Sequence, residues 1–543
     1  MRTTAAATRV ALAAFALSFI VLIANGRAIG SGDTNAMERT AGSLIERGSV
    51  VLPEDGVSDP FTRAVPGGRV SIYPVLPALL AAPLFFVCRL FFDLSPAGLQ
   101  VAGKLSAAFL AALATALLAR SFARRVSPAM ALGCAVLFGL GTSVYSTAQA
   151  LWQHPAVLLF LVIAIDALAR LDDNTTASLQ PGLIAALCLS LAAASRPAVI
   201  PLCGALFIYL LIRARAQAAS LMAVACVPAG AVAVYNATLF GAPWRFGPSG
   251  VGGRFFEALP ESLAGLLVSP ARGLLVFTPI ALVAAWGLIT QSRRPLSRAL
   301  MAAAAVHFVF MACWNEWHGG ESFGPRLLTD LLPALFFFLP EGVATLPKAG
   351  AVLGLASVAI QFLGGWTYDY RWERLHQRGQ EFDRALWSWA DSPIAFAVRE
   401  GVLTQGIPDL EGRRVRLRLR HSVPFGPEGA VIEGTPNGLR ISGDALVRDI
   451  RLERGARMAG GWIALSHPGD AVAFRTGSSG ARSLRLVGSH TGLLRIDTPY
   501  GSTSVPSSGD FDLSVPLTLA SGDEAYVRAE TGELRLARLE VGR

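Results

Sequence analysis

Long apolar runs dominate the first two thirds of the chain and stop near residue 366. Each run approaches the ~20 residues that a helix needs to cross a bilayer core of ~30 Å. Inside lipid only a helix satisfies its own backbone hydrogen bonds within one segment. We therefore predict about eleven membrane-spanning helices, within residues 8–25, 101–119, 128–147, 153–170, 182–196, 198–213, 219–239, 272–290, 298–314, 325–340 and 348–366.

One further apolar run, 73–92, decides the topology. It contains three prolines and Arg89, and if it crossed the membrane the basic loops would face outward, against the positive-inside bias. We predict that it is an amphipathic helix at the outer membrane surface. The N-terminus then lies inside, whereas the long loop 26–100, the other candidate loops and the C-terminal domain lie outside.

The chain changes character after residue 366. Residues 367–405 are charged and aromatic, which is typical of one or two short helices at a membrane surface. From 406 to 543, short alternating runs such as "SLRLVG" and "LLRIDTP" are separated by Gly, Pro, Asp or Ser, which predicts short strands in an antiparallel β-sandwich or jelly roll. The predicted fold class is thus a mostly α, polytopic membrane protein (1–366) with a helical linker (367–405) and a C-terminal all-β domain (406–543).

Composition agrees with a membrane protein and argues against other classes. Of the 543 residues 53% are hydrophobic and only 16% are charged. The net charge of +9 sits largely between apolar runs, so it indicates topology and not a nucleic-acid partner. The six cysteines lie in apolar stretches without metal-ligand spacing, and no Walker loop, GxGxxG or HExxH motif occurs. The first apolar run resembles a signal peptide, but more spans follow it, which favours an uncleaved first helix.

Asp33 is the first candidate for chemistry, because it lies a few residues beyond the first predicted span. A carboxylate at the lipid–water boundary suits a general base that serves a lipid-borne partner. The stretch "DTNAMER" also fits a helix N-cap, so both roles stay open for Asp33. Glu38 follows on the same predicted helix.

Two other outward loops collect polar residues. "YSTAQALWQHP" carries His154, either a catalyst or an ordinary interfacial residue. "CWNEWHGGESFGPR" carries Glu316, His318, Glu321 and Arg326, and charges at a membrane edge are costly unless they are paired or functional. Glu316 and His318 are also metal-ligand types, which leaves a divalent metal open without assigning a metal site.

Arginines recur at the predicted outer helix ends. A guanidinium binds a lipid phosphate with two parallel hydrogen bonds, although a single arginine also snorkels to headgroups without any function. As candidate ligands of a lipid-linked phosphate we take Arg69, Arg196, Arg272 and Arg326. The candidates for binding the substrate or its phosphate also include Glu38, His154, Glu316, His318 and Glu321.

The stretches "SGDTNAMER", "SIYPVLPALLAAP" and "SFGPRLL" together resemble the GT-C class of integral-membrane glycosyltransferases, which includes protein O-mannosyltransferases and aminoarabinose transferases. "LWQHP", "SPARGLLVFTP" and "WHGGESFGPR" look most like its uncharacterised bacterial members, and the resemblance covers about residues 1–400.

The resemblance implies a multi-pass protein of the bacterial inner membrane with a periplasmic C-terminal domain. It implies sugar transfer from a polyprenyl-phosphate-linked donor to a glycan, lipid or protein acceptor on the outer face, with inversion and with Asp33 as general base. No cofactor is implied with certainty. Many relatives carry a second acid in the next outward loop, where this chain has His154. In this chain Glu38 or Glu321 would have to supply that second acid. Metal dependence stays open.

Two other functions remain as alternatives. One is a transporter or flippase for a lipid-linked glycan, against which we see neither matching halves nor a charged residue poised within a span. The other is a non-enzymatic assembly protein for envelope glycans, whose β domain binds glycan or a partner.

Overall fold

The chain forms two compact units in the computed structural model, Met1–Arg418 and Leu419–Arg543, and each is described by itself. The structure describes residues 2–53, 59–173, 179–245, 255–368, 370–376, 380–400, 407–408, 414–415, 430–435, 438–442, 447–453, 457–459, 462–465, 471–476, 481–499, 501–519, 524–531 and 534–542.

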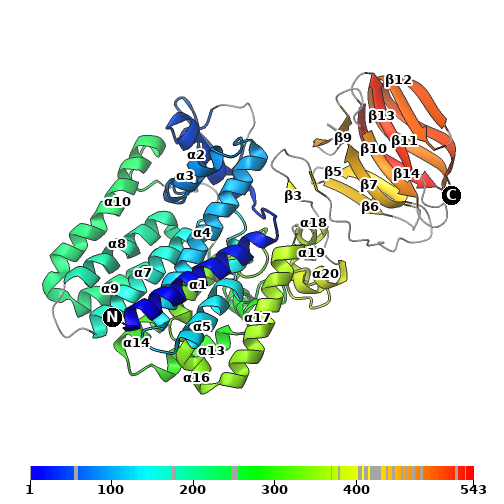
Figure 1. Ribbon diagram of the computed structural model, residues 1–543. Helices are drawn as coiled ribbons and strands as arrows, with labels where there is room; N and C mark the ends of the chain where they lie inside the picture. The colour runs from blue at the N-terminus through cyan, green and yellow to red at the C-terminus, as the bar shows by residue number, and fades with distance from the viewer. Residues whose placement is uncertain are drawn as a thin grey trace. The chain divides into compact units, whose positions relative to one another are not determined.

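The first unit is a bundle of helices (Figure 1). Among its described residues, six helices are long and apolar enough to cross a membrane: Ala5–Ala24 in α1 (Arg2–Ala24), α4 (Pro96–Phe122), α7 (His154–Asp173), Arg215–Phe240 with α10 (Ala218–Phe240), α14 (Pro295–Ala312) and α17 (Pro347–Thr367). A seventh crossing would come from Arg326–Phe336 and Leu339–Thr345, two helical pieces that meet at a bend of 70°. Helix α1 packs on α4, α4 on α7, and α7 on α8.

The remaining predicted spans contain shorter helices. The larger of these are α5 (Pro128–Leu140), α8 (Leu179–Ser195), α9 (Ile200–Arg213) and α13 (Ala281–Thr290). Helix α11 (Leu259–Val268) lies between two predicted spans. Short helical pieces are α6 (Val144–Thr147), α12 (Leu274–Phe277), α15 (Leu332–Phe336), α16 (Leu339–Thr345), η1 (Pro197–Val199), η2 (Arg215–Gln217) and η3 (Arg326–Leu331). Every predicted run therefore contains helix, while the number of about eleven crossings stays a prediction.

Serine–proline pairs explain where two helices begin. The Ser95 hydroxyl accepts a hydrogen bond from the Gly98 N–H at the start of α4, and Ser127 does the same for Met130 at the start of α5. In both helices proline occupies the first turn, where its missing N–H costs nothing.

The long loop after α1 has its own structure. It contains α2 (Gly32–Arg47), a hairpin of β1 (Thr62–Val65) and β2 (Gly68–Ser71), and α3 (Leu76–Arg89). The hairpin turn needs Gly67, whose φ is +86°. Helix α3 has 14 residues and is about 21 Å long, too short to cross a bilayer core. A helix in 73–92 is thus confirmed, and its place at the membrane surface stays a prediction.

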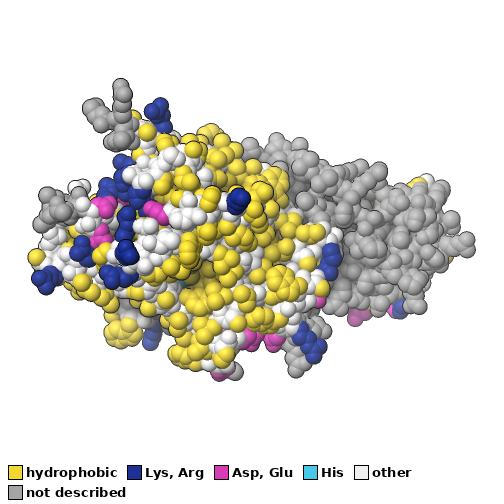
Figure 2. Space-filling view, turned by 90° about the horizontal axis from the view of Figure 1, so that it is seen from below, with side chains coloured by type: hydrophobic (Ala, Val, Ile, Leu, Met, Phe, Trp, Pro, Cys, Tyr) yellow, Lys and Arg dark blue, Asp and Glu magenta, His cyan; other side chains and the backbone are white. Residues whose placement is uncertain are grey.

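Figure 2 shows a broad apolar face on the helical unit. Large hydrophobic side chains of this unit, such as Ile208, Val234 and Leu355, are more than half exposed. An exposed apolar surface of this extent is typical of contact with lipid.

The linker contains three short helices, where one or two were predicted: α18 (Arg371–His376), α19 (Gln380–Leu386) and α20 (Pro393–Glu400). The Ser392 hydroxyl accepts a hydrogen bond from the Ala395 N–H at the start of α20.

The described part of the C-terminal unit is all β. Its strands are β5 (Ala430–Thr435), β6 (Gly438–Ser442), β7 (Val447–Glu453), β8 (Arg457–Ala459), β9 (Trp462–Leu465), β10 (Ala471–Thr476), β11 (Ala481–Thr498), β12 (Gly501–Leu519), β13 (Glu524–Thr531) and β14 (Leu534–Gly542), paired antiparallel. Before them lie β3 (Ile407–Pro408) and β4 (Arg414–Val415).

One strand prediction was wrong. "SLRLVG" and "LLRIDTP" were expected as two short strands, yet both belong to β11, an 18-residue strand. Its first half pairs with β14 and its second half with β13, so the change of partner happens within one continuous strand. The predicted sandwich architecture stays a prediction.

Candidate active site

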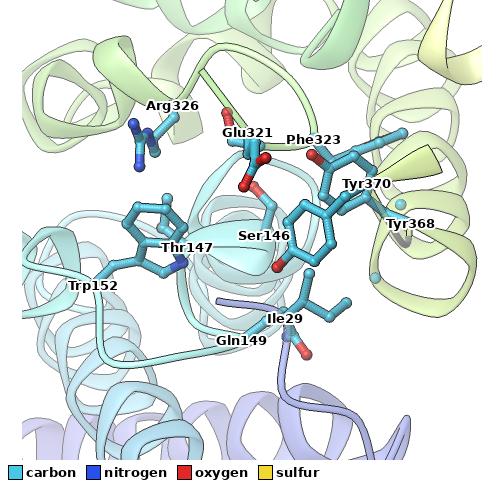
Figure 3. A pocket seen from close by; sticks show the side chains of 13 residues that line it. Ile29, Ser146, Thr147, Gln149, Trp152, Glu321, Phe323, Arg326, Tyr368 and Tyr370 are labelled. Carbon is cyan, nitrogen blue, oxygen red and sulfur yellow. The ribbon is translucent and has the colours of Figure 1, made fainter. Parts of the chain in front are cut away.

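A pocket opens where several distant parts of the helical unit meet (Figure 3). It holds about 350 Å³ of empty space, part of which is open to solvent. The lining side chains come from the segment after α1, from α6 and the turn after it, from the loop before η3, and from the end of α17. They are Ile29, Ser146, Thr147, Gln149, Trp152, Glu321, Ser322, Phe323, Arg326, Tyr368 and Tyr370, with Gly364 and Gly365.

The two glycines of α17 bring its backbone close to the pocket. A Cβ on Gly365 would lie 1.9 Å from the Tyr145 ring, and one on Gly364 would lie 2.1 Å from the Phe323 ring. The Gly365 carbonyl also accepts a hydrogen bond of 2.5 Å from Asn25 at the end of α1. This wall therefore depends on residues without side chains.

Asp33 lies beside the pocket, joined to it by Arg326. The Arg326 Nη1 donates to Asp33 Oδ2 at 2.9 Å, and the Ser31 hydroxyl donates to Asp33 Oδ1. Ser31 is the N-cap of α2, with Asp33 two residues further on, so the interpretation of Asp33 as the N-cap is wrong. Asp33 keeps its place in the first turn, where the helix dipole favours a carboxylate.

Arg326 is held on several sides. Besides Asp33, it donates through Nη2 to the Gly319 carbonyl at 2.6 Å, and its guanidinium lies 4.2 Å from the centre of the Trp152 ring. Its buried Nε has no partner among the described residues. Arg326 thus presents charge at the border between Asp33 and the pocket.

Glu321 is the carboxylate among the residues that line the pocket. It is exposed, and no hydrogen bond or ion pair joins it to the described part of the chain. Across the pocket, Tyr370 donates its hydroxyl to the Gly30 carbonyl. Tyr368 donates to Glu373 at 2.8 Å. Burial raises the pKa of both tyrosines, so they stay neutral donors.

A buried lysine lies under the pocket, contrary to the expectation that no charged residue is poised within a span. Lys104, in α4, donates to Asn25 Oδ1, to the Arg27 carbonyl at 2.5 Å and to Gln149 Oε1 at 3.1 Å. The sequence argument overlooked Lys104 because a single lysine hardly changes the hydropathy of an Ala- and Leu-rich run. These three acceptors among the described residues are neutral, so Lys104 is held there by hydrogen bonds to dipoles and not by an ion pair.

Asp330 was also overlooked, and it binds two of the predicted site residues. Its Oδ1 is 2.8 Å from His154 Nδ1, and Arg196 Nη1 donates to its Oδ2. Asp330 is fully buried and His154 nearly so. His154 and Arg196 therefore meet each other through a protein carboxylate, and neither lines the pocket.

Arg272 is fully buried among protein partners. It donates to the His318 carbonyl at 2.9 Å, to the Gly320 carbonyl at 3.1 Å and to Glu373 at 2.8 Å, and it lies 5.0 Å from the centre of the Trp372 ring. These contacts fasten the loop that carries Glu321 to α18.

Glu316 and His318 form a pair, in which Glu316 Oε2 lies 3.2 Å from His318 Nε2. Among the described residues no three His, Cys, Asp or Glu side chains gather as metal ligands, so the pair has no third ligand of these types there. Neither residue lines the pocket.

The last two predicted residues lie apart from the pocket. Glu38 is buried against Gly103 of α4, accepts a hydrogen bond of 3.3 Å from the Leu151 N–H, and burial raises its pKa to about 8. Arg69 stays within the β1–β2 hairpin, where it donates to the Thr62 hydroxyl at 2.7 Å.

No family model and no curated protein matches the chain. Among solved structures it is similar to ArnT from Cupriavidus metallidurans bound to undecaprenyl phosphate, with 15% identity, a TM-score of 0.44, and coverage of 72% of this chain and 67% of that one. It is also similar to arabinofuranosyltransferase AftD from Mycobacteria (11%, TM-score 0.40, 98% and 61% covered) and to an Archaeoglobus fulgidus oligosaccharyltransferase (13%, TM-score 0.36, 70% and 60% covered). At TM-scores below 0.5 these similarities carry no argument about this chain, so its function has to be inferred from its own residues.

Proposed function

We propose that the protein is a multi-pass membrane glycosyltransferase that moves a sugar from a polyprenyl-phosphate-linked donor to an acceptor hydroxyl on the outer face of the membrane. The observation that carries this proposal is the Asp33–Arg326 pair at the edge of a pocket lined by Trp152, Glu321 and Tyr370. Aromatic faces and hydrogen-bonding groups suit a sugar. A guanidinium suits the phosphate that a sugar leaves behind.

In the proposed reaction Asp33 takes the proton of the acceptor hydroxyl. The acceptor oxygen bonds to the anomeric carbon, the bond from that carbon to the phosphate oxygen breaks, and the polyprenyl phosphate leaves with the electron pair. Both Asp33 oxygens already accept hydrogen bonds, from Ser31 and Arg326. A phosphate that engages Arg326 would replace Asp33 as its partner and leave Oδ2 for the incoming hydroxyl.

The test is transfer of labelled sugar from polyprenyl-phosphate donors by the purified protein in lipid nanodiscs. Replacing the base (Asp33→Asn) is expected to lower the rate by about 10²–10⁴-fold, the usual contribution of a general base. A matched control is Asp59→Asn, in the same outer loop. Asp59 pairs with Arg39 at 3.4 Å, and its side chain is 18% exposed against 19% for Asp33.

A wild-type rate of sugar transfer by the Asp33→Asn variant would contradict the role of Asp33 as general base. If the wild-type protein makes no glycosidic bond but moves a lipid-linked sugar across liposomes, the transporter alternative is correct.

A further inference from the structure

A second set of polar contacts joins the elements that carry the pocket's walls. Its centre is Asp330, which is 0% exposed and has a partner on each carboxylate oxygen, His154 at 2.8 Å and Arg196. The Thr329 hydroxyl is 2.8 Å from the Ser143 hydroxyl. Asp330 and Thr329 both belong to η3, the six-residue segment that begins at Arg326.

These contacts fix where Arg326 stands. A 3₁₀ segment rises about 2 Å per residue, so Asp330 lies about 8 Å along the segment from Arg326. Segment η3 continues directly into the five-residue α15, and the 70° bend follows between Phe336 and Leu339, so η3 belongs to a short helical piece. Its leucines Leu327, Leu328 and Leu331 are buried in the core, and Thr329 and Asp330 add the polar contacts that fix it against neighbouring segments.

The partners of η3 also carry the opposite wall. Ser143 directly precedes α6, which supplies Ser146 and Thr147 to the pocket. His154 follows two residues after Trp152, whose ring lies against the Arg326 guanidinium. One buried carboxylate and one hydroxyl pair thus set the spacing between Arg326 and the Trp152 side of the pocket.

The contacts are hard to loosen. A buried carboxylate that loses its partners is strongly destabilising, whereas the intact, fully hydrogen-bonded network tolerates burial. Asp330 is therefore expected to keep one arrangement while ligands exchange at Arg326.

We propose that Asp330 is a positioning residue that sets the Arg326 guanidinium against Asp33 and the pocket. This inference rests on the proposed function only in that Arg326 is taken as a site residue. Asp330 does not touch the pocket and takes no part in the chemistry.

The test measures the coupling between Asp33 and Arg326 in the ligand-free, full-length protein. Thermal unfolding midpoints are compared for wild type, Asp33→Asn, Arg326→Gln and the double variant, and the non-additive part is the coupling. The cycle is then repeated in an Asp330→Asn background and in a Glu341→Gln background. Glu341 is the matched control, because it forms an ion pair of 2.7 Å with Arg125, and both side chains are less than a fifth exposed.

We expect a wild-type coupling of roughly a few degrees, lost with Asp330→Asn and kept with Glu341→Gln. A general loss of stability would lower all midpoints in both backgrounds without removing the coupling. Coupling that survives Asp330→Asn, that disappears equally with Glu341→Gln, or that is absent from wild type would overturn the proposal.

If Asp330→Asn does not fold, Thr329→Val removes the hydroxyl contact with Ser143 and is expected to reduce the coupling by a smaller amount. Unchanged coupling in Thr329→Val would then count against the proposal. Binding of undecaprenyl phosphate in nanodiscs is measured separately. A wild-type protein that fails to bind it contradicts the proposed function and leaves the coupling result standing.

Discussion

Charged side chains near the two ends of α7 have different kinds of partners. Near its C-terminal end, Arg170 pairs with Asp166 at 2.7 Å, and Arg213 pairs with Asp172 at 2.8 Å. Near its N-terminal end, about 30 Å away along the helix, lie the pocket and its surroundings. There Lys104 has only neutral acceptors and Glu38 has a backbone N–H.

Simple ion pairs suffice to anchor helices, so the first arrangement needs no functional explanation. At the second end Asp330 is fully paired with His154 and Arg196, but Lys104 and Glu38 are buried ionisable groups whose described partners are neutral, which costs stability. Such a cost is typical of functional sites. The contrast therefore supports the location of the site independently of any resemblance, and three predictions test it.

The largest effect is expected from Glu38. Its pKa of about 8 lies above the ordinary value of 4.5 because of burial. Between these pH values the folded protein holds a proton that the unfolded chain has released, so stability falls as pH rises through the window, by up to about 1.4 kcal/mol per pH unit. Glu38→Gln should remove this slope, as measured by thermal midpoints from pH 5 to 8.

The control for this slope is Glu46→Gln, an exposed residue of the same helix. It should keep the wild-type slope. Parallel pH curves for wild type and Glu38→Gln would mean that Glu38 is ionised in the folded protein, and the contrast between the two ends of α7 would lose this example.

A smaller effect is expected from filling the pocket wall. Gly365→Ala places a methyl group 1.9 Å from the Tyr145 ring, and overpacking of this kind costs about 1–3 kcal/mol. Gly133→Ala is the matched control, since Gly133 is also helical and a Cβ there meets nothing within 4 Å. It should be neutral or stabilising by up to about 1 kcal/mol. Equal midpoints for the two variants would show that α17 moves freely away from the pocket.

Hydropathy predicted the helices well, because burial in lipid depends on local composition. It also selected Asp33 and Arg326, since both are charges at predicted helix ends. Their contact joins residues 293 positions apart, and no local pattern reports such a distance. The same applies to Asp330, which lay inside an apolar run and had no visible partner.

Two features that the sequence did not show have a related cause. His154 and Arg196 were considered as site residues one by one, and the carboxylate of Asp330 joins them. The two short runs at the start and end of β11 form one strand, which changes its partner from β14 to β13. In each case the deciding neighbour came from elsewhere in the chain.

The smallest effect is expected at the other end of α7. The Arg170 side chain is 48% exposed and pairs with an Asp166 that Arg124 also binds. Exposed pairs contribute about 0–1 kcal/mol, and here Arg124 remains after the change. Arg170→Ala should therefore shift the thermal midpoint by no more than about 2 °C, less so at high salt. A shift as large as that of Gly365→Ala would mean that this end also depends on a tightly coupled network, and the contrast with the pocket end would no longer distinguish anchoring charges from functional ones.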